Sequence, residues 1–252
     1  MAMTTAARGG ERTTAARRAG RRLRRGSLTP EMIVTESLRM LDADPSAGFS
    51  LPKLGRALGA DPTAVYRHFA SKDDLVLAIA DRLIEESIAG FSAQPCWLDT
   101  IAEATRRLRE TYLAHPAAAA LAAARTTQRP AEMRIVNIVL GAVLEAGFEG
   151  AAAATAYRAI GDFALYWACG DAAFMALPAS QRRNDQAAWT RAYLAVDRSE
   201  YPHIWRVRDE LAGVTDDAVF EAILTAVVEG FRVLAPRPCT CTKHGGPDGQ
   251  AK

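Results

Sequence analysis

Tyr66, Arg67, His68 and Lys72 place four polar side chains within seven residues of one another. Hydroxyl, imidazole and ammonium groups donate hydrogen bonds to the phosphate oxygens of DNA. A guanidinium such as that of Arg67 is the commonest side chain to read guanine in the major groove. A turn between helices needs none of these groups, so the cluster predicts a surface that binds duplex DNA. The structural alternatives are that Tyr66 covers a small core, His68 caps a helix and Lys72 is merely solvated.

The segment just before this cluster is typical of a helix that enters the major groove by its first turn. Asp61 is a helix-capping residue type, and Pro62 favours the first helical position. The Thr63 hydroxyl can form a hydrogen bond with a base edge, and the Ala64 methyl can touch a thymine methyl. Arg67 follows Thr63 by about one helical turn, so we expect it to face a base or a neighbouring phosphate.

Four helices are predicted to position these residues. The first begins at Thr29 and Pro30, and the second begins at Ser50 as its cap and ends at Gly59. The third is the short segment just described, and the fourth begins at Ser71. Two short helices joined by a tight turn with a glycine form a helix-turn-helix, whose second helix enters the groove. We therefore expect a three-helix, helix-turn-helix DNA-binding domain within residues 28–90.

The stretch LPKLGRALGADPTAVYRHFASKDDLVLAIADRL, which begins at Leu51, closely resembles the DNA-binding end of tetracycline-repressor (TetR) family regulators. The resemblance covers about residues 29–84, with a turn glycine, a Tyr-x-His-Phe block, a lysine and a leucine in the family's spacing. Farther on, YPHIWRVRDELAGVTDDAVFEAILTAVVEGF is similar to the end of a tetracycline-repressor-type C-terminal domain. The resemblance implies a sequence-specific regulator whose second domain binds a ligand and dimerises.

Carried over position by position, the resemblance implies a set of DNA contacts. Phosphate contacts are implied for Ser50, Tyr66, His68 and Lys72, and base contacts for Pro62, Thr63, Ala64 and Arg67. Lys53, on the second helix, is counted with the DNA-facing residues. Gly55 stands where an alanine is usual, and Pro52 stands where some relatives carry a base-reading polar residue. Because glycine costs about 1 kcal/mol inside a helix, we expect weaker base reading by the second helix.

The remaining chain predicts an all-α fold, because apolar residues recur at spacings of three and four and almost nothing alternates. Helices are expected near residues 97–114, 117–126, 130–146, 150–177, 186–195, 201–212 and 216–234. Together they predict a larger helical bundle for ligand binding and dimerisation over residues 95–235. The last helix is too apolar to face water alone, so it and the helix at 150–177 are predicted to form a homodimer interface.

Candidate pocket residues are polar or aromatic side chains on otherwise apolar helices, because ligand pockets are mostly apolar with a few polar anchors. They are Tyr112, His115, Arg125, Asn137, Tyr157, Tyr166 and Trp189. The alanine and aromatic content of the bundle favours a small, largely apolar effector. With the family resemblance, this predicts a repressor that the effector releases from a palindromic operator in double-stranded DNA. A DNA-binding activator and a ligand-independent DNA-binding protein are alternatives.

The charge of the chain is concentrated at its start. Residues 1–27 hold eight arginines and one glutamate, a charge of +7, so the rest carries −5 of the net +2. An arginine-rich N-terminal segment such as residues 1–27, the arginine-rich arm, binds a polyanion or stays disordered. A third interpretation is that it is an organelle-targeting segment. The tail, residues 236–252, is rich in Gly, Pro, Lys and Thr and is also predicted to be disordered.

Other function classes find little support in the sequence. It contains no phosphate loop, no HExxH and no Glu-x-x-His iron motif, so a helical enzyme is the less favoured alternative. No apolar run of about 18 residues occurs, so no membrane span is predicted and a cytoplasmic location is expected.

The four cysteines are too few and too unevenly spaced for a disulfide framework, which is typical of a reducing cytosol. They are Cys96, Cys169, Cys239 and Cys241. Cys239, Cys241 and His244 form a possible ligand cluster in the tail, but the sequence shows no fourth ligand beside them. We therefore predict no metal site and no cofactor.

Overall fold

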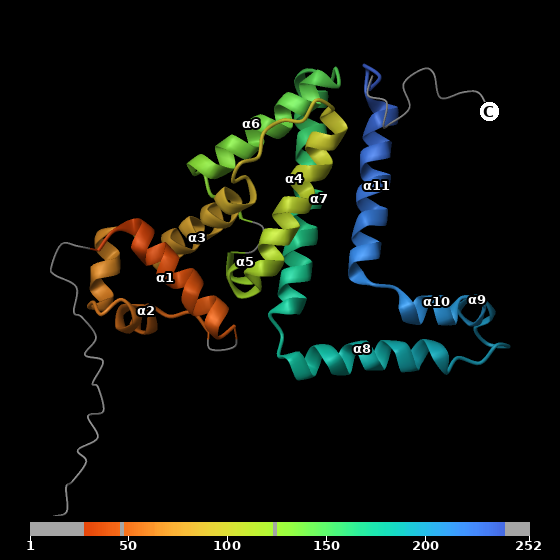
Figure 1. Ribbon diagram of the computed structural model, residues 1–252, viewed down its shortest axis with the longest axis horizontal. Helices are drawn as coiled ribbons and strands as arrows, with labels where there is room; N and C mark the ends of the chain where they lie inside the picture. Colours follow the sequence, from red (N-terminus) through yellow and green to blue (C-terminus); the bar gives the residue numbers. More distant parts are fainter. Residues whose placement is uncertain (1–27, 46–47, 123–124, 240–252) are drawn as a thin grey trace, which may run out of the picture.

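The computed structural model describes residues 28–45, 48–122 and 125–239, and this part of the chain is all-α (Figure 1). The predicted arginine-rich arm, residues 1–27, lies outside the described residues. The predicted DNA-binding domain contains α1 (Pro30–Ala43), α2 (Leu51–Ala57), the 3₁₀ helix η1 (Pro62–Arg67) and α3 (Lys72–Ser87). In Figure 1, α3 runs from the DNA-binding end toward the larger bundle.

Capping side chains determine where these helices begin. The Thr29 hydroxyl accepts from a first-turn N–H of α1 at 3.3 Å, and the Ser71 hydroxyl accepts from the Asp74 N–H at 3.0 Å. The Asp74 carboxylate accepts from the Ala70 N–H at 2.9 Å, which completes a reciprocal cap at the start of α3. The side chain of Ser50, in contrast, makes no capping hydrogen bond, although its backbone is extended as in an N-cap. The prediction of a capping side chain is therefore wrong there.

The turn between α2 and η1 gives a reason for the glycine in α2. Gly59 has a φ of 62°, in the left-handed region that favours glycine. A Cβ atom on Gly55 would lie 3.0 Å from the Ala60 carbonyl oxygen and 3.0 Å from the Pro62 ring. Gly55 therefore lets the turn pack directly against α2, which holds η1 close to its partner helix.

The larger domain is a bundle of long helices with one short connection. It contains α4 (Trp97–Ala114), α5 (Pro116–Ala122), α6 (Pro130–Glu145), α7 (Gly150–Met175) and α11 (Asp216–Leu234). α4 and α7 lie side by side at its centre, α6 packs on α3, and α11 lies along α4 (Figure 1). This agrees with the predicted bundle of helices.

Three further helices form an arm that extends from the end of α7 (Figure 1). They are α8 (Ala179–Leu194), α9 (Pro202–Arg206) and α10 (Arg208–Gly213), and none of their residues is buried. α8 begins earlier than the expected residue 186, because its polar first turns carry no apolar periodicity. The single helix expected at 201–212 is instead two helices, because Val207 has a non-helical backbone.

Two clusters of buried apolar side chains hold the molecule together. The first contains Ile33 and Leu54 of the DNA-binding domain and continues into Ala118 of α5 and Ala168 of α7. The second lies between α4, α6, α7 and α11, and Phe220 is one of its largest members. Because the first cluster includes side chains from both domains, the DNA-binding domain is packed onto the bundle through a shared core.

The chain beyond α11 turns back onto the bundle. Residues 236–239, assigned to the tail from sequence, are described, and the Arg237 N–H donates to the Ala146 carbonyl at 2.9 Å. Cys239 is buried. The rest of the predicted tail, residues 240–252, lies outside the described residues.

A bilayer-spanning segment is also missing from the described helices, since none combines the necessary length and apolar character.

Candidate DNA-binding face and effector cavities

The predicted base-reading residues lie on η1, which is fixed to the domain by two apolar anchors. Val65 and Phe69 point into the core, with 1% and 3% of their surface exposed. This burial sets the rotation of η1 and directs its other side outward. Of the predicted base contacts, Thr63 and Arg67 are exposed, and Pro62 and Ala64 are half-buried.

Asp61 orients the Thr63 hydroxyl. The Asp61 carboxylate accepts from that hydroxyl at 2.6 Å and from the Thr63 N–H at 2.8 Å. These hydrogen bonds hold the pKa of the Asp61 carboxyl below its usual value, so the carboxylate stays ionised. Because the hydroxyl proton is already donated to Asp61, Thr63 is left as an acceptor, which suits the amino group of adenine or cytosine.

The predicted phosphate contacts surround the end of η1. Tyr66 is 52% exposed, and Arg67, His68 and Lys72 are exposed beside it. The Lys72 ammonium donates to the Phe49 carbonyl at 3.1 Å and lies 5.7 Å from the centre of the Phe49 ring. These four exposed side chains therefore lie within the seven residues that lead from η1 into α3.

Two contacts predicted from the second helix adjoin this group. Lys53 is half-buried, with its ammonium 3.5 Å from the Gly48 carbonyl. Ser50 is half-buried and follows directly after Phe49, the residue that Lys72 contacts. Lys53, Ser50 and Lys72 thus meet around the loop before α2, so residues of two helices form one basic surface.

A cavity of about 310 Å³ lies between the end of α3 and helices α4, α6 and α7. We call it the α3 cavity. Its walls are mostly apolar, with Ile84 and Ile101 among them, and three predicted pocket residues line it: Arg125, Tyr157 and Tyr166. Burial raises the pKa of the Tyr157 hydroxyl, which keeps it neutral and able to donate a hydrogen bond.

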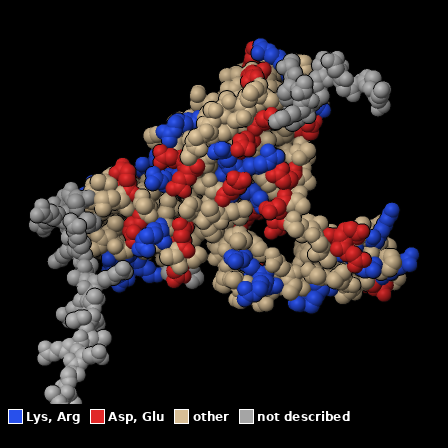
Figure 2. All heavy atoms as spheres, in the orientation of Figure 1, with Lys and Arg blue, Asp and Glu red and all other residues tan. Residues whose placement is uncertain are grey.

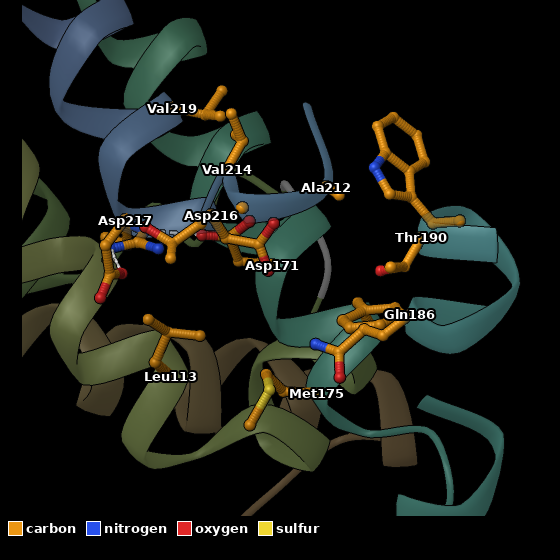
Figure 3. A pocket seen from close by; sticks show the side chains of 15 residues that line it. Leu113, Asp171, Met175, Gln186, Thr190, Ala212, Val214, Asp216, Asp217 and Val219 are labelled. Atoms are coloured by element: carbon orange, nitrogen blue, oxygen red, sulfur yellow. Dashed lines mark hydrogen bonds and ion pairs between the residues drawn. The ribbon is translucent and has the colours of Figure 1, made fainter. Parts of the chain in front are cut away.

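A larger hollow of about 850 Å³ lies between the bundle and the α8–α10 arm (Figure 3). We call it the arm cavity, and Trp189, another predicted pocket residue, lines it. On its inner wall, Arg109 forms ion pairs with Asp171 at 2.6 Å and Asp217 at 2.8 Å. The guanidinium also lies 4.4 Å from the centre of the Phe220 ring. Arg109 therefore joins α4, α7 and α11 at one point.

The other three predicted pocket residues line neither cavity. Tyr112 is 1% exposed and belongs to the shared core, where burial raises the pKa of its hydroxyl. The His115 ring lies 2.9 Å from the Asp42 carboxylate and 3.2 Å from that of Glu86, so it connects α1, α3 and the end of α4. Asn137 is exposed on α6.

Residues 125–132 fasten the connection between α5 and α6 to α3, and we call these contacts the α3 clamp. Arg125 pairs with Asp73 at 2.9 Å, and Arg129 pairs with Asp74 at 2.5 Å. The hydrogen bond from Arg125 lowers the pKa of the Asp73 carboxyl. On the face of the molecule shown in Figure 2, Lys and Arg side chains lie among Asp and Glu side chains. Both aspartates lie in the first turn of α3, next to Lys72.

Asp81 extends the clamp by capping α6 from another helix. Its carboxylate accepts from the Ala131 N–H at 3.3 Å and from the Glu132 N–H at 3.0 Å. The Glu132 carboxylate accepts from the Thr127 hydroxyl at 2.7 Å and from the Gln128 N–H at 2.9 Å. Gln128 has a φ of 58°, a conformation that costs a non-glycine residue about 1–2 kcal/mol. The clamp thus holds a strained loop residue in place.

Apart from Arg125, which was predicted as a pocket residue, sequence reasoning did not identify the clamp residues as functional. Asp81 and Ala131 are separated by 50 residues, and Arg129 and Asp74 by 55. No local spacing relates groups so far apart in the chain. The only signal nearby is Pro130, a residue type that marks the first position of a helix.

A helix-turn-helix domain with an exposed polar cluster, packed on a helical bundle with an internal cavity, defines the class of two-domain transcriptional regulators. Residues 33–79 match the family described as bacterial regulatory proteins, tetR family. Residues 92–235 match the tetracyclin repressor-like C-terminal domain. The chain belongs to the TetR family of regulators.

Several proteins are similar to this chain. An HTH-type transcriptional regulator of Saccharopolyspora erythraea is 32% identical over 138 residues, which are 55% of this chain and 58% of that protein. The match thus spans little more than half of this curated relative. A TetR regulator from Streptomyces coelicolor is 26% identical with a TM-score of 0.68, covering 82% of this chain and 99% of the other. ActR from the same organism, in complex with actinorhodin, shares the fold at 20% identity and a TM-score of 0.72, covering 84% and 99%.

Proposed function

We propose that the protein is a sequence-specific DNA-binding repressor that a small, largely apolar effector releases from a palindromic operator. The observation that carries the proposal is the exposed group of Tyr66, Arg67 and His68 at the end of a core-anchored η1. These side chains have the chemistry to contact phosphates and a base at once. The family membership supports the same function.

A palindrome requires two copies of η1, and a homodimer supplies them about one DNA turn, roughly 34 Å, apart. The outer side of α11 is suited to such an interface. One row of exposed residues on this helix recurs at helical spacing and is small or apolar: Ala218, Ala222, Ala226, Gly230 and Val233. α7 likewise exposes Ala159, Gly170 and Ala173. Small residues allow helices to approach closely, so α7 and α11 of two copies form the proposed interface.

We place the effector in the α3 cavity, because that cavity adjoins the clamp. Arg125 and Glu132 both line the cavity and belong to the α3 clamp. An effector that binds Arg125 and Glu132 and changes their positions alters the contacts that hold α3. This helix follows η1 and begins with Lys72, so its movement also moves the predicted DNA contacts. The effector shifts the equilibrium toward the conformation that does not bind DNA, by as much as it binds that conformation more tightly than the DNA-binding one. The structural neighbour ActR was solved in complex with actinorhodin, which supports a small-molecule effector for this chain.

The test of DNA recognition is selection of bound sequences from random duplex DNA by the purified full-length protein. Recovery of one palindromic motif is expected. The Arg67→Ala variant should recover a degenerate motif, and the matched Arg191→Ala variant, which changes an exposed arginine on α8, should recover the full motif. The proposal is contradicted if the folded wild-type protein selects no motif. The selection is run both without and with a small-molecule extract of the cells in which the protein naturally occurs.

A further inference from the structure

One carboxylate in the wall of the α3 cavity has no cationic partner. Four charged residues line the cavity: Arg125, Glu132, Arg158 and Asp162. The Arg158 Nε atom lies 2.7 Å from both carboxylate oxygens of Asp162, and Arg125 pairs with Asp73, which does not line the cavity. Within the part of the chain that the structure describes, no lysine, arginine or histidine pairs with Glu132. The cavity wall therefore carries one negative charge that no side chain balances.

The two oxygens of the Glu132 carboxylate have different surroundings. Oε2 accepts hydrogen bonds from the Thr127 hydroxyl at 2.7 Å, from the Gln128 N–H at 2.9 Å and from the Thr127 N–H. Oε1 accepts none from residues 28–45, 48–122 and 125–239. Over the same residues, the indole nitrogen of Trp167 is the single buried side-chain nitrogen or oxygen without a partner. Oε1 is therefore accessible, and it is open to a further donor.

Tyr157 adds a hydroxyl to this open oxygen. Its hydroxyl makes no hydrogen bond with a described residue and, like Glu132 Oε1, is accessible. Burial and, next, the negative charge of Glu132 raise the pKa of the Tyr157 hydroxyl, which indicates that the two groups lie near each other. The buried side chains of Ile84, Ile101 and Val139 supply an apolar wall. The volume of about 310 Å³ suits one small molecule with an apolar body.

The charge of the cavity determines which polar group that molecule carries. In a partly desolvated site a carboxylate interacts more strongly with a cation than it does in water, because the effective dielectric constant is lower. An anion in the same place is repelled, and a neutral group gains only a hydrogen bond. An ammonium has three N–H donors, so it can donate to Glu132 Oε1 and also to the Tyr157 hydroxyl oxygen.

We propose that the effector of the α3 cavity is a small organic cation, a protonated amine on a largely apolar body, whose ammonium binds Glu132. This inference rests on the proposed function, which places the effector in the same cavity. Glu132 belongs to the α3 clamp, because its Oε2 holds Thr127 and Gln128. A cation at Oε1 draws on the same carboxylate charge and so weakens those hydrogen bonds. The Thr127 hydroxyl also lies 3.1 Å from the Asp81 carboxylate, which connects the ammonium site to α3.

The experiment measures binding to the full-length protein without DNA, by isothermal titration calorimetry with three probes that share one apolar group. Naphthylethylamine, naphthylethanol and naphthylacetate are a cation, a neutral alcohol and an anion at neutral pH. The amine should bind at least about tenfold more tightly than the alcohol, and the acid should bind most weakly. Glu132→Gln keeps the size of the side chain and removes its charge. It should lower the affinity for the amine about tenfold and leave that for the alcohol unchanged. Glu145→Gln, at an exposed carboxylate of the same helix, is the matched control and should change neither affinity.

The order of the three affinities is measured on the unmodified protein, so the test does not depend on a variant that folds. Three outcomes overturn the proposal: an amine that binds no more tightly than the alcohol or the acid, a folded Glu132→Gln variant that keeps the preference for the amine, or a folded wild-type protein that binds none of the three.

These titrations also separate the ligand class from the proposed function, because they contain no DNA. A protein that prefers the amine and selects no DNA motif keeps the cation site and loses the regulator function. A protein that selects a motif and shows no preference for the amine loses only the ligand class.

Discussion

Arg67 and Lys72 are both basic and exposed, yet we expect them to act differently on DNA. Arg67→Ala should reduce discrimination at one operator position, by about 1–3 kcal/mol. Lys72→Ala should weaken binding to all sequences alike and lower the slope of log affinity against log salt by about 1, because one phosphate contact is lost. Fluorescence anisotropy with the selected operator and its single-base variants, over a range of salt concentrations, measures both effects.

The Arg191→Ala variant controls for general loss of positive charge, because Arg191 is exposed on the arm, away from η1. It should change neither the base preference nor the salt slope. If Lys72→Ala changed the base preference and left the slope intact, the division of roles between Arg67 and Lys72 would be wrong.

The Cys169 thiol provides a pH-dependent test of burial. Burial raises its pKa to about 11 from the ordinary 9.0. At pH 8 its thiolate fraction is then about 100-fold lower in the folded protein than in the unfolded chain. Alkylation by iodoacetamide should lag by about that factor, and rise about tenfold per pH unit until the pH nears 11. Peptide mass spectrometry at timed quenches measures the rate, and equal rates in native and urea-unfolded protein would contradict this prediction.

Among the helices, two arginines of α4 offer a matched comparison. Arg109 is buried and joins Asp171 and Asp217, whereas Arg106 forms an exposed pair with Glu221 at 2.8 Å. Arg109→Ala should lower the free energy of unfolding by about 3 kcal/mol, because it leaves a largely buried carboxylate on α7 without its partner. Arg106→Ala should cost no more than about 1 kcal/mol. Urea denaturation of both variants checks the difference, and equal costs would show that Arg109 is not a structural junction.

The α3 clamp can be tested through Asp81, the residue of α3 that caps α6. Asp81→Ala removes acceptors from two backbone N–H groups of α6. We expect a loss of about 1–2 kcal/mol in the free energy of unfolding, as for other helix caps. Asp185→Ala, at an exposed carboxylate of α8, should change it by less than about 0.5 kcal/mol. If urea titrations found the Asp81→Ala variant as stable as the unchanged protein, the clamp would not hold α3 and α6 together.

The elements that sequence predicts well are those determined by neighbouring residues. Asp61 and Ser71 cap η1 and α3 through groups two and three positions away, so their roles were visible in the chain. The clamp was not visible, because its partners are separated by some fifty residues. Tyr112 and Tyr157 illustrate the limit for pockets. Each is a tyrosine on an apolar helix, and only the packing decides that the first is core and the second lines a cavity.

For the molecule as a whole, one charged substitution on α11 should prevent dimerisation and leave the fold intact. Ala226 is exposed in the middle of the proposed interface, and Ala226→Glu would place two like charges near each other across it. We expect a folded monomer with at least tenfold weaker operator binding, equivalent to about 1.4 kcal/mol. Leu144→Glu, at an apolar residue of α6 that is 50% exposed, should remain dimeric. Sedimentation velocity distinguishes the two, and a dimeric Ala226→Glu protein would exclude this part of α11.

The α8–α10 arm has a separate consequence for the whole molecule. None of its residues is buried, and its ring contacts are made near the surface. Examples are the guanidinium groups of Arg198 and Arg208, which lie 4.6 Å and 4.4 Å from the centre of the Trp205 ring. Opening the arm therefore exposes little apolar surface and requires only a small part of the global free energy of unfolding. Its amide hydrogens should exchange with deuterium long before those of α3 or α4. Within residues 28–239, the range that the structure describes, trypsin should cut the native chain first in this arm.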